Sequence, residues 1–301
     1  MSSPFFRASL FVLLVLGGLF ADAFSLAPAS AQSHVDIEFE NEGRNIEKLS
    51  LDQLAAIRPA VSLKVFEIHE NRERIYRALP ARPVFDKVFG KDWRKAQEIA
   101  FTSIDGYQPS VPVAKFLAHD AYFAFAHEDG TPFTMTNVLQ NNEIVPLGPL
   151  YLVWDNMNSK VLLESGASDM PYQIKRVELK SGAWFANMSP PSGSPAAARR
   201  GFVHFRKHCM ACHSINGEGG GKAPELNYPA SVAEYIKPEY LKRWILNPQS
   251  IRYNTAMPAL AKEIPRREKV AGELIAYFKA MSTAKRAPAK LPEKRELQPQ
   301  Q

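Results

Sequence analysis

The apolar positions follow two different patterns, one in the first part of the chain and one in the second. Between residues 61 and 179, short apolar runs alternate with one or two helical stretches, and the runs at 121–126 and 150–154 are typical of buried strands. Residues 172–179 predict a half-buried strand with a slip in its alternation. From residue 196 to 283 the pattern is helical, with loops rich in glycine and proline. We therefore expect the α+β fold class, with a mixed α+β domain followed by an all-α domain.

The boundary between these regions is marked by composition. Residues 189–195 read Ser-Pro-Pro-Ser-Gly-Ser-Pro, which sustains neither a helix nor a strand ladder. We predict a linker there, between a front domain at 32–188 and a C-terminal domain at 196–283. The Lys-, Pro- and Gln-rich residues 284–301 predict a disordered tail. Glu-Asp-Gly at 128–130 is a hairpin-type turn signal.

The first residues have the layout of a secretory signal peptide. Arg7 precedes an apolar run at 10–20, and Ala-Ser-Ala at 29–31 fits a cleavage site. A transmembrane anchor is the alternative, but a spanning helix needs about 20 apolar residues, and Asp22 follows too soon. We expect residues 1–31 to direct export to the periplasm, and no membrane span after their removal.

Composition and charge exclude several classes. Hydrophobic residues make up 46% of the 301 positions and charged residues 23%, which excludes a mostly disordered chain. Lys and Arg number 37 against 31 Asp and Glu, for a formal charge of +6. That excess is too small and too dispersed to predict a nucleic-acid partner.

The two cysteines predict the chemistry. Cys209 and Cys212 are followed directly by His213, giving the C-x-x-C-H spacing of c-type haem attachment. A zinc site would need further paired Cys or His. A thioredoxin-like pair would start a helix rather than end one, and a structural disulfide gives no reason for the adjacent His. We predict one covalently attached haem c, with His213 as the proximal iron ligand.

Met257 is the predicted sixth ligand. It precedes Pro258 in a loop on the C-terminal side of the attachment motif, and a thioether opposite His raises the reduction potential. The alternative is that Met257 fills the core, as methionines commonly do. His204 and His208 lie on the helix that precedes the motif, so we expect them at the surface or in packing contacts.

Several motifs around the attachment site together resemble a class I cytochrome c. They are the C-x-x-C-H, Gly201 with Phe205, Tyr240-Leu-x-x-Trp244, Thr255-x-Met257-Pro258 and the last helix from Gly272 to Phe278. The resemblance implies a small all-α fold in which the first and last helices cross. It places Gly201 and Phe205 against Leu274, Tyr277 and Phe278, and it implies that Pro224 braces the proximal His. It also implies one low-spin haem that shuttles single electrons.

The front domain resembles the molybdopterin-binding domain of the sulfite-oxidase fold. The resemblance rests on Asp-Gly-Tyr at 105–107, Asp-Gly at 129–130 and Gly-Pro-Leu-Tyr-Leu-Val at 148–153. It implies a mixed domain with a twisted sheet. That family holds molybdenum through a Cys thiolate, and both cysteines here are used by haem, so we expect no molybdopterin. The domain then serves as a docking surface or small-ligand pocket, marked by Asp105, Tyr107 and the Gly148–Pro149 turn, although a local turn with a packed aromatic also explains Asp105 to Tyr107.

We expect structural roles for two further histidines and three tryptophans. His119 and His127 flank the predicted strand at 121–126, and we expect both in exposed edge or loop positions. We expect Trp93, Trp154 and Trp184 to anchor the core or a domain interface.

Basic residues gather in sequence around the haem region, and they can steer an acidic redox partner. They are Lys207, Lys222, Lys237, Lys242, Arg243, Lys262, Arg266 and Arg267. A solvated surface is the alternative explanation. The sequence favours a periplasmic electron carrier that accepts electrons from a redox protein or dehydrogenase, rather than a stand-alone enzyme. The alternative is a two-centre oxidoreductase whose front domain binds a pterin, metal or substrate.

Overall fold

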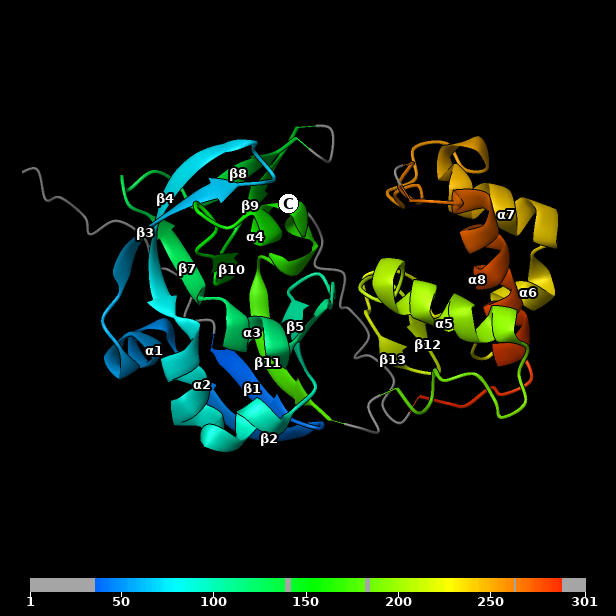
Figure 1. Cartoon of the computed structure of the whole chain (residues 1–301), viewed down its shortest axis with the longest axis horizontal. Coiled ribbons are helices and arrows are strands. Elements are labelled where there is room, and N and C mark those ends of the chain that lie inside the picture. Colours follow the sequence, from blue (N-terminus) through cyan, green and yellow to red (C-terminus); the bar gives the residue numbers. More distant parts are fainter. Residues whose placement is uncertain (1–35, 139–141, 182–184, 263, 289–301) are drawn as a thin grey trace, which may run out of the picture. The chain divides into compact units, whose positions relative to one another are not determined.

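The computed structural model describes residues 36–138, 142–181, 185–262 and 264–288. The expected signal peptide, Trp184 and residues 289–301 of the expected tail lie outside the described residues. The structure contains both helices and sheets, in agreement with the predicted α+β class (Figure 1).

The larger sheet of the front domain has five strands in the order β2-β1-β11-β5-β6. They are β1 (Ile37–Asn41), β2 (Arg44–Leu49), β5 (Glu98–Ser103), β6 (Ser110–Pro112) and β11 (Ile174–Lys180). β1 pairs in parallel with β11, and the other neighbours are antiparallel. The first strand of the domain is therefore held by its last strand.

The second sheet has four strands in the order β10-β7-β4-β3, and a separate two-stranded ribbon pairs β8 with β9. These strands are β3 (Val61–Glu67), β4 (Arg72–Pro80), β7 (Ala121–His127), β8 (Thr134–Asn137), β9 (Glu143–Pro146) and β10 (Tyr151–Trp154). The connecting helices are α1 (Leu51–Ile57), α2 (Ala81–Phe89), η1 (Lys91–Lys95), α3 (Val113–Ala118), α4 (Lys160–Glu164) and η2 (Ala167–Asp169).

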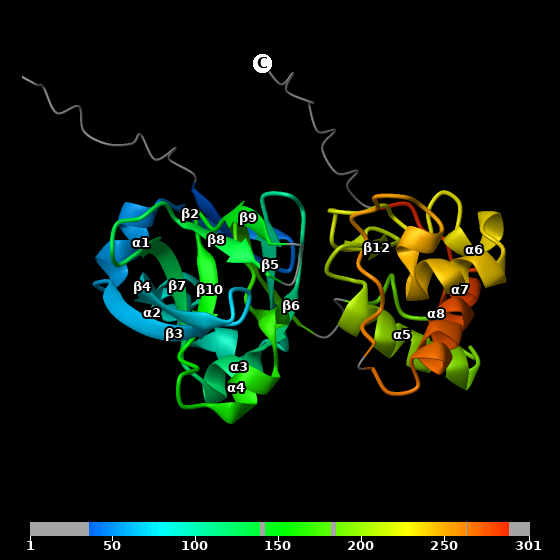
Figure 2. The same cartoon turned by 90° about the horizontal axis from the view of Figure 1, so that it is seen from above.

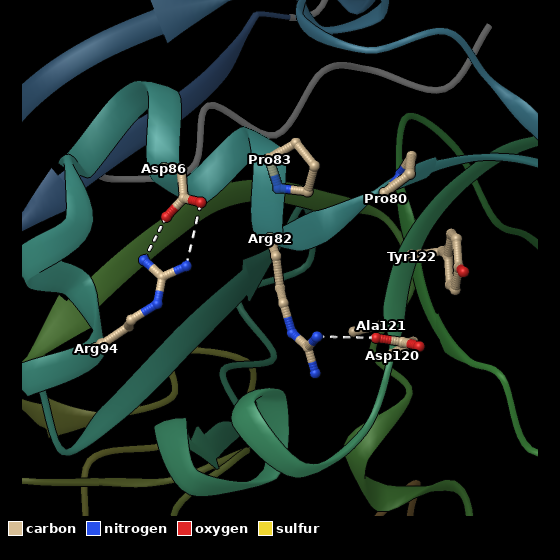
Figure 3. Close-up of a pocket in the computed structure, with 8 residues that line it drawn as sticks. All are labelled: Pro80, Arg82, Pro83, Asp86, Arg94, Asp120, Ala121 and Tyr122. Carbon is tan, nitrogen blue, oxygen red and sulfur yellow. Dashed lines mark hydrogen bonds and ion pairs between the residues drawn. The ribbon is translucent and has the colours of Figure 1, made fainter.

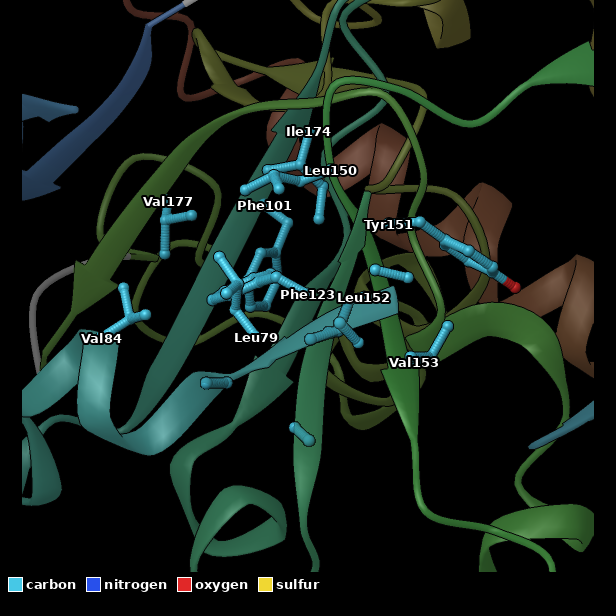
Figure 4. Packing of buried hydrophobic residues seen from close by; sticks show 14 of the residues in the cluster. Leu79, Val84, Phe101, Phe123, Leu150, Tyr151, Leu152, Val153, Ile174 and Val177 are labelled. Carbon is cyan, nitrogen blue, oxygen red and sulfur yellow. The ribbon is translucent and has the colours of Figure 1, made fainter. Parts of the chain in front are cut away.

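The two sheets share one aromatic-rich core (Figure 4). Phe101 of β5 and Phe123 of β7 are fully buried, with ring centroids 6.4 Å apart. Trp93 and Trp154 are buried in the same core, as predicted. Such pairs add packing energy beyond the area that they bury.

The predicted strands are present with small shifts of their ends. The runs at 121–126, 150–154 and 172–179 become β7, β10 and β11. The predicted slip in the last run corresponds to a register shift against β5 between Ile174 and Arg176.

Two expectations for the neighbourhood of β7 are wrong. His127 is only 3% exposed, because its ring stacks on Tyr76 and its Nε2 lies 2.9 Å from the carbonyl oxygen of Thr134. The turn at 128–130 does not close a hairpin, because β7 pairs with β4 and β10, whereas β8 pairs with β9.

The C-terminal domain is mainly helical, but it is not the all-α domain that was expected, because it also contains a two-stranded antiparallel ribbon. Its elements are α5 (Ala196–His208), β12 (Ser214–Ile215), β13 (Glu218–Gly219), α6 (Val232–Tyr235), α7 (Pro238–Leu246), η3 (Pro248–Ser250) and α8 (Arg267–Met281). α5 ends in Arg206, Lys207 and His208, whose position suits the negative end of the helix dipole.

The first and last helices of this domain, α5 and α8, cross in close contact (Figures 1 and 2). A Cβ on Gly201 would lie 2.0 Å from the carbonyl oxygen of Glu273 and 2.7 Å from the Cβ of Tyr277. Phe205 packs on Tyr277 and Phe278, with ring centroids 5.4 and 6.0 Å apart. The crossing implied by the cytochrome resemblance is therefore observed, with Gly201 at its closest point.

Residues just outside the predicted bounds of the C-terminal domain, 196–283, also contact its helical core. Met188 is buried there, and its carbonyl oxygen accepts a hydrogen bond of 2.6 Å from Tyr277 Oη. At the other end, the carbonyl of Ala284 and the amide of Arg286 both bond the side chain of Asn216. Within the described range, the start of the expected tail is thus held against the domain.

Across the described ranges, no helix combines the length and the hydropathy required of a transmembrane span.

Candidate functional site

The attachment motif forms a tight turn at the end of α5. The amide of Cys209 donates to the carbonyl of Phe205 at 2.9 Å, which completes the helix. The amides of Cys212 and His213 then both donate to the carbonyl of Cys209, at 3.1 and 2.9 Å. This local winding brings the two cysteines and His213 onto one turn of the chain.

His213 is oriented by a backbone carbonyl. Its Nδ1 lies 2.7 Å from the carbonyl oxygen of Pro224. A carbonyl only accepts, so Nδ1 is protonated and Nε2 keeps the lone pair that an iron ligand needs. Burial lowers the pKa of His213, and the Pro224 bond opposes that shift. The structure thus places Pro224 where the resemblance implies a brace for the proximal His.

The glycine-rich segment after the motif packs onto the attachment turn itself. A Cβ on Gly220 would lie 2.1 Å from the carbonyl oxygen of Ala211, and one on Gly219 would lie 2.4 Å from that of His213. The amide of Gly220 donates to the carbonyl of Met210 at 2.8 Å. Glycine is required here because the returning backbone leaves no space for a side chain.

The two cysteines form no disulfide in this structure. Burial raises the pKa of Cys209 to about 12, and it also raises the pKa of Cys212. A thioredoxin-type pair has a lowered thiol pKa instead. The raised pKa values of the two thiols therefore do not favour the redox-pair alternative.

Met257 lies in the loop between η3 and α8, with a partly buried side chain. Its amide donates to Thr255 Oγ1 at 3.2 Å. Further along the loop, the amide of Leu260 donates to the carbonyl of Ile245 at 3.0 Å, which ties the segment to α7. The role of Met257 as the sixth ligand stays a prediction.

His204 and His208, expected at the surface or in packing contacts, lie on α5. The Nε2 atom of His204 lies 3.0 Å from Glu273 Oε2 on α8. Burial lowers the pKa of His208 to about 4, and neighbouring Lys207 and His204 add to that shift. His204 therefore joins the contact between the two crossing helices.

The chain's own residues fit a c-type haem. Two thiols and an imidazole with a free Nε2 lie on one turn, the glycine-rich segment packs onto it, and this donor set is that of a c-type haem site. Residues 196–277 match the family model described as cytochrome C oxidase, cbb3-type, subunit III. The C-terminal part of this chain is therefore a cytochrome c domain. A search of curated proteins finds no match to the chain. The sulfite-oxidase resemblance of the front domain stays a prediction.

The eight predicted basic residues divide into two groups. Lys222 pairs with Asp105 at 2.8 Å and Lys242 with Glu268 at 2.7 Å, while Arg267 Nε donates to a backbone carbonyl. The other five have exposed side chains: Lys207, Lys237, Arg243, Lys262 and Arg266.

Asp105, Tyr107 and the Gly148–Pro149 turn, which were predicted to mark a ligand pocket, lie in two loops. Both loops are hydrogen-bonded to the backbone of Gln173. The amide of Ile104 donates to the carbonyl of Gln173 at 2.9 Å, and the amide of Gln173 donates to the carbonyl of Leu147 at 2.9 Å. The Asp105–Tyr107 and Gly148–Pro149 turns are therefore anchored to the same point of the chain.

Sequence reasoning missed a polar cluster in the front-domain core, centred on the fully buried Glu67. Its carboxylate accepts hydrogen bonds from Tyr76 Oη at 2.8 Å and Tyr151 Oη at 2.9 Å. His69 Nδ1 lies 3.0 Å from the same carboxylate, so that nitrogen is a donor. The contributing strands are β3, β4 and β10, and no local motif joins them.

A pocket of about 300 Å³ lies beside the start of α2 (Figure 3). Arg82 in its wall pairs with Asp120 at 3.0 Å, and Arg94 donates to Asp86 at 3.1 Å. These charged groups are satisfied by one another. The pocket contains none of the residues predicted for a site.

Proposed function

We propose that this protein is an exported, periplasmic electron carrier with one haem c, attached through Cys209 and Cys212. His213 is the proximal ligand and Met257 the distal ligand. The observation that carries the proposal is the attachment turn, where the Pro224 carbonyl fixes the imidazole tautomer beside the two thiols. Bound haem c supplies reversible one-electron chemistry.

The chain's residues contribute three things to that role. The turn at 209–213 fixes the attachment geometry through hydrogen bonds to the Cys209 carbonyl. The crossing of α5 and α8 holds this turn on a rigid helix. The exposed basic side chains provide a positive surface, which favours a redox protein with an acidic docking face.

The front domain is proposed to dock the electron donor, a redox protein or dehydrogenase, rather than to hold a second redox centre. Both cysteines of the chain are used by the haem in this proposal, so no protein thiolate is left to hold molybdenum. The alternative, a two-centre oxidoreductase, has support only from the resemblance of the domain to a molybdopterin-binding fold.

Cofactor stoichiometry separates these two functions. The full chain is expressed in a host that matures both c-type haem and molybdenum cofactor, and iron, molybdenum and covalent haem are measured per chain. We expect one iron, one covalent haem and no molybdenum. Near-stoichiometric molybdenum would establish the two-centre enzyme instead, and absence of covalent haem would overturn the proposal altogether.

The distal ligand is tested by Met257→Leu, which removes the sulfur and nearly preserves the volume. Met281→Leu is the matched control, because Met281 is buried at the end of α8. We expect Met257→Leu to abolish the weak thioether–iron absorption band and to lower the reduction potential. Retention of both properties would exclude Met257 as the ligand.

A further inference from the structure

The loop between β5 and β6 in the front domain bonds the haem-attachment segment of the cytochrome domain. The amide of Gln108 donates to the carbonyl of Ala211, inside the C-x-x-C-H motif, at 2.7 Å. In return, the amide of Gly221 donates to the carbonyl of Gly106 at 2.9 Å. Both segments belong to the same compact unit of the chain.

Charged side chains reinforce these backbone bonds. Asp105 Oδ2 lies 2.8 Å from Lys222 Nζ, and both side chains are partly exposed. The amide of Tyr107 donates to Asp105 Oδ1 at 2.9 Å, which fixes the carboxylate in an Asx turn. Lys222 Nζ also lies 5.7 Å from the ring centroid of Tyr107. Asp105 and Tyr107 therefore make a polar and an aromatic contact with the same lysine.

The fit is close enough to require glycine at position 106. A Cβ there would lie 2.9 Å from the carbonyl carbon of Gly221 and 3.0 Å from the amide nitrogen of Lys222. Gly106 also has φ +87°, a conformation that side-chain-bearing residues rarely adopt.

The front domain fixes the shape of this loop on its own. The amide of Gly106 donates to the carbonyl of Ser103 at 3.0 Å, and the amide of Ser103 donates to the carbonyl of Tyr107 at 2.8 Å. Ser103 Oγ donates to the carbonyl of Tyr172 at 2.6 Å. The loop is therefore preorganised for the contact and pays little ordering entropy when it forms.

A second contact anchors the base of the same hairpin. Arg206, in the last turn of α5, donates to the carboxylate of Glu98 at the start of β5. Arg206 also lies over the ring of Phe185, with its guanidinium carbon 3.5 Å from the ring centroid. Both ends of the β5–β6 hairpin thus contact residues next to the attachment turn.

We propose that residues 105–108 form an intramolecular clasp on Ala211 and Gly220–Lys222, so that the front domain covers the attachment edge of the cytochrome domain. If the proposed function is correct and haem is attached at Cys212, the clasp shields that edge of the haem and directs external partners to another face; this part of the inference rests on the proposed function. Burial, and then the neighbouring Cys212, raise the pKa of Tyr107, consistent with a covered position.

The chain provides a matched control for the clasp. Asp129-Gly130-Thr131 repeats the Asp-Gly turn, with the Thr131 amide bonded to Asp129 Oδ1 at 3.1 Å. Gly130 has φ +73°, yet nothing lies within 4 Å of its Cβ position. Gly106→Ala and Gly130→Ala therefore impose similar backbone strain, and only the first disturbs the clasp.

The test is hydrogen–deuterium exchange of the full chain, followed by mass spectrometry of peptides that cover 209–222. We expect Gly106→Ala to accelerate exchange at Gly221 by about 30-fold, the factor for losing two net backbone hydrogen bonds. Gly130→Ala should leave these peptides at the wild-type rate. Equal exchange in the two variants would overturn the clasp.

A second pair of variants covers the case in which Gly106→Ala does not fold. Asp105→Asn removes the ion pair with Lys222, and Asp129→Asn is its control. We expect faster exchange of the 209–222 peptides in the first variant alone, and identical behaviour of the two would refute the clasp. The exchange readout does not depend on haem, whereas covalent haem content tests the proposed function, so failure of one is distinguishable from failure of the other.

In haem-loaded protein, the clasp has a further readout. Reduction by ascorbate, a reagent small enough to use any open haem edge, is expected to be faster in Gly106→Ala than in Gly130→Ala. Equal reduction rates would contradict shielding of the haem edge.

Discussion

An added methyl group at Gly201 should weaken the contact between α5 and α8. In Gly201→Ala, the new Cβ would lie 2.0 Å from the carbonyl oxygen of Glu273, whereas 3.4 Å begins ordinary contact. The nearest atoms belong to the backbone of Glu273, which cannot rotate away as the end of a side chain could. The two helices α5 and α8 must therefore move apart to make room for the methyl group. Overpacking of a core costs about 1–3 kcal/mol. Replacing a mid-helix glycine by alanine returns about 1 kcal/mol of helix propensity.

Gly272→Ala on α8 is the matched control, because nothing lies within 4 Å of its Cβ position. It gains the propensity without the clash and should be stabilised by about 0.5–1 kcal/mol. Because both variants gain the helix propensity of alanine, their free energies of unfolding should differ by the overpacking cost, about 1–3 kcal/mol. Urea titration of haem-loaded protein, followed by haem absorbance, measures both values. Equal stability of the two variants would refute the close crossing at Gly201.

Three further predictions concern charge and buried polarity. Burial raises the pKa of Glu70, but hydrogen bonds from Arg74, Arg72 and the Thr136 amide lower it to about 2. The ionised carboxylate therefore stabilises the fold fully above pH 4.5, and this stabilisation is lost as the pH falls to about 2. Glu70→Gln should remove about 1–2 kcal/mol at pH 7, less than the full pKa shift corresponds to because the exposed Arg72 is screened by solvent, and it should flatten the acid limb of the stability–pH curve. Tyr151→Phe deprives the buried Glu67 of a donor and should cost about 1–3 kcal/mol in urea titrations, whereas Tyr122→Phe should be nearly neutral. Stopped-flow electron exchange with an acidic partner should slow as salt rises and in Lys237→Gln. Lys279→Gln is the control, because Lys279 is an exposed lysine in the last turn of α8 that does not belong to the eight basic residues, and its rate should stay unchanged. A rate indifferent to salt and to Lys237→Gln would exclude steering.

The sequence predicts most of the cytochrome domain because its determinants are local. The attachment motif, the helix before it and the Pro224 brace all lie within about 30 residues of one another, and the structure places them together. The crossing of α5 and α8 is not local, and it was expected only because the resemblance to a class I cytochrome c implies it.

The front domain was less predictable because its contacts join distant segments. The strands at 121–126 and 150–154 follow from apolar runs, but their partners do not. His127 was expected to be exposed, and its burial depends on Tyr76, a residue of β4 far from it in sequence. The cluster around Glu67 likewise gathers residues up to 84 positions apart, which no local spacing reveals.

The parallel pairing of β1 with β11 has a consequence for the order in which the front domain assembles. Arg176 of β11 and Glu38 of β1 form a hydrogen bond across 138 positions of sequence. The N-terminal hairpin β1–β2 can form early, yet its inner edge acquires a partner only when β11 is available. Closing so long a loop is slow, and an unpaired strand edge is prone to association meanwhile. The front domain would therefore depend on chaperones during folding more than the helical domain that follows it in sequence.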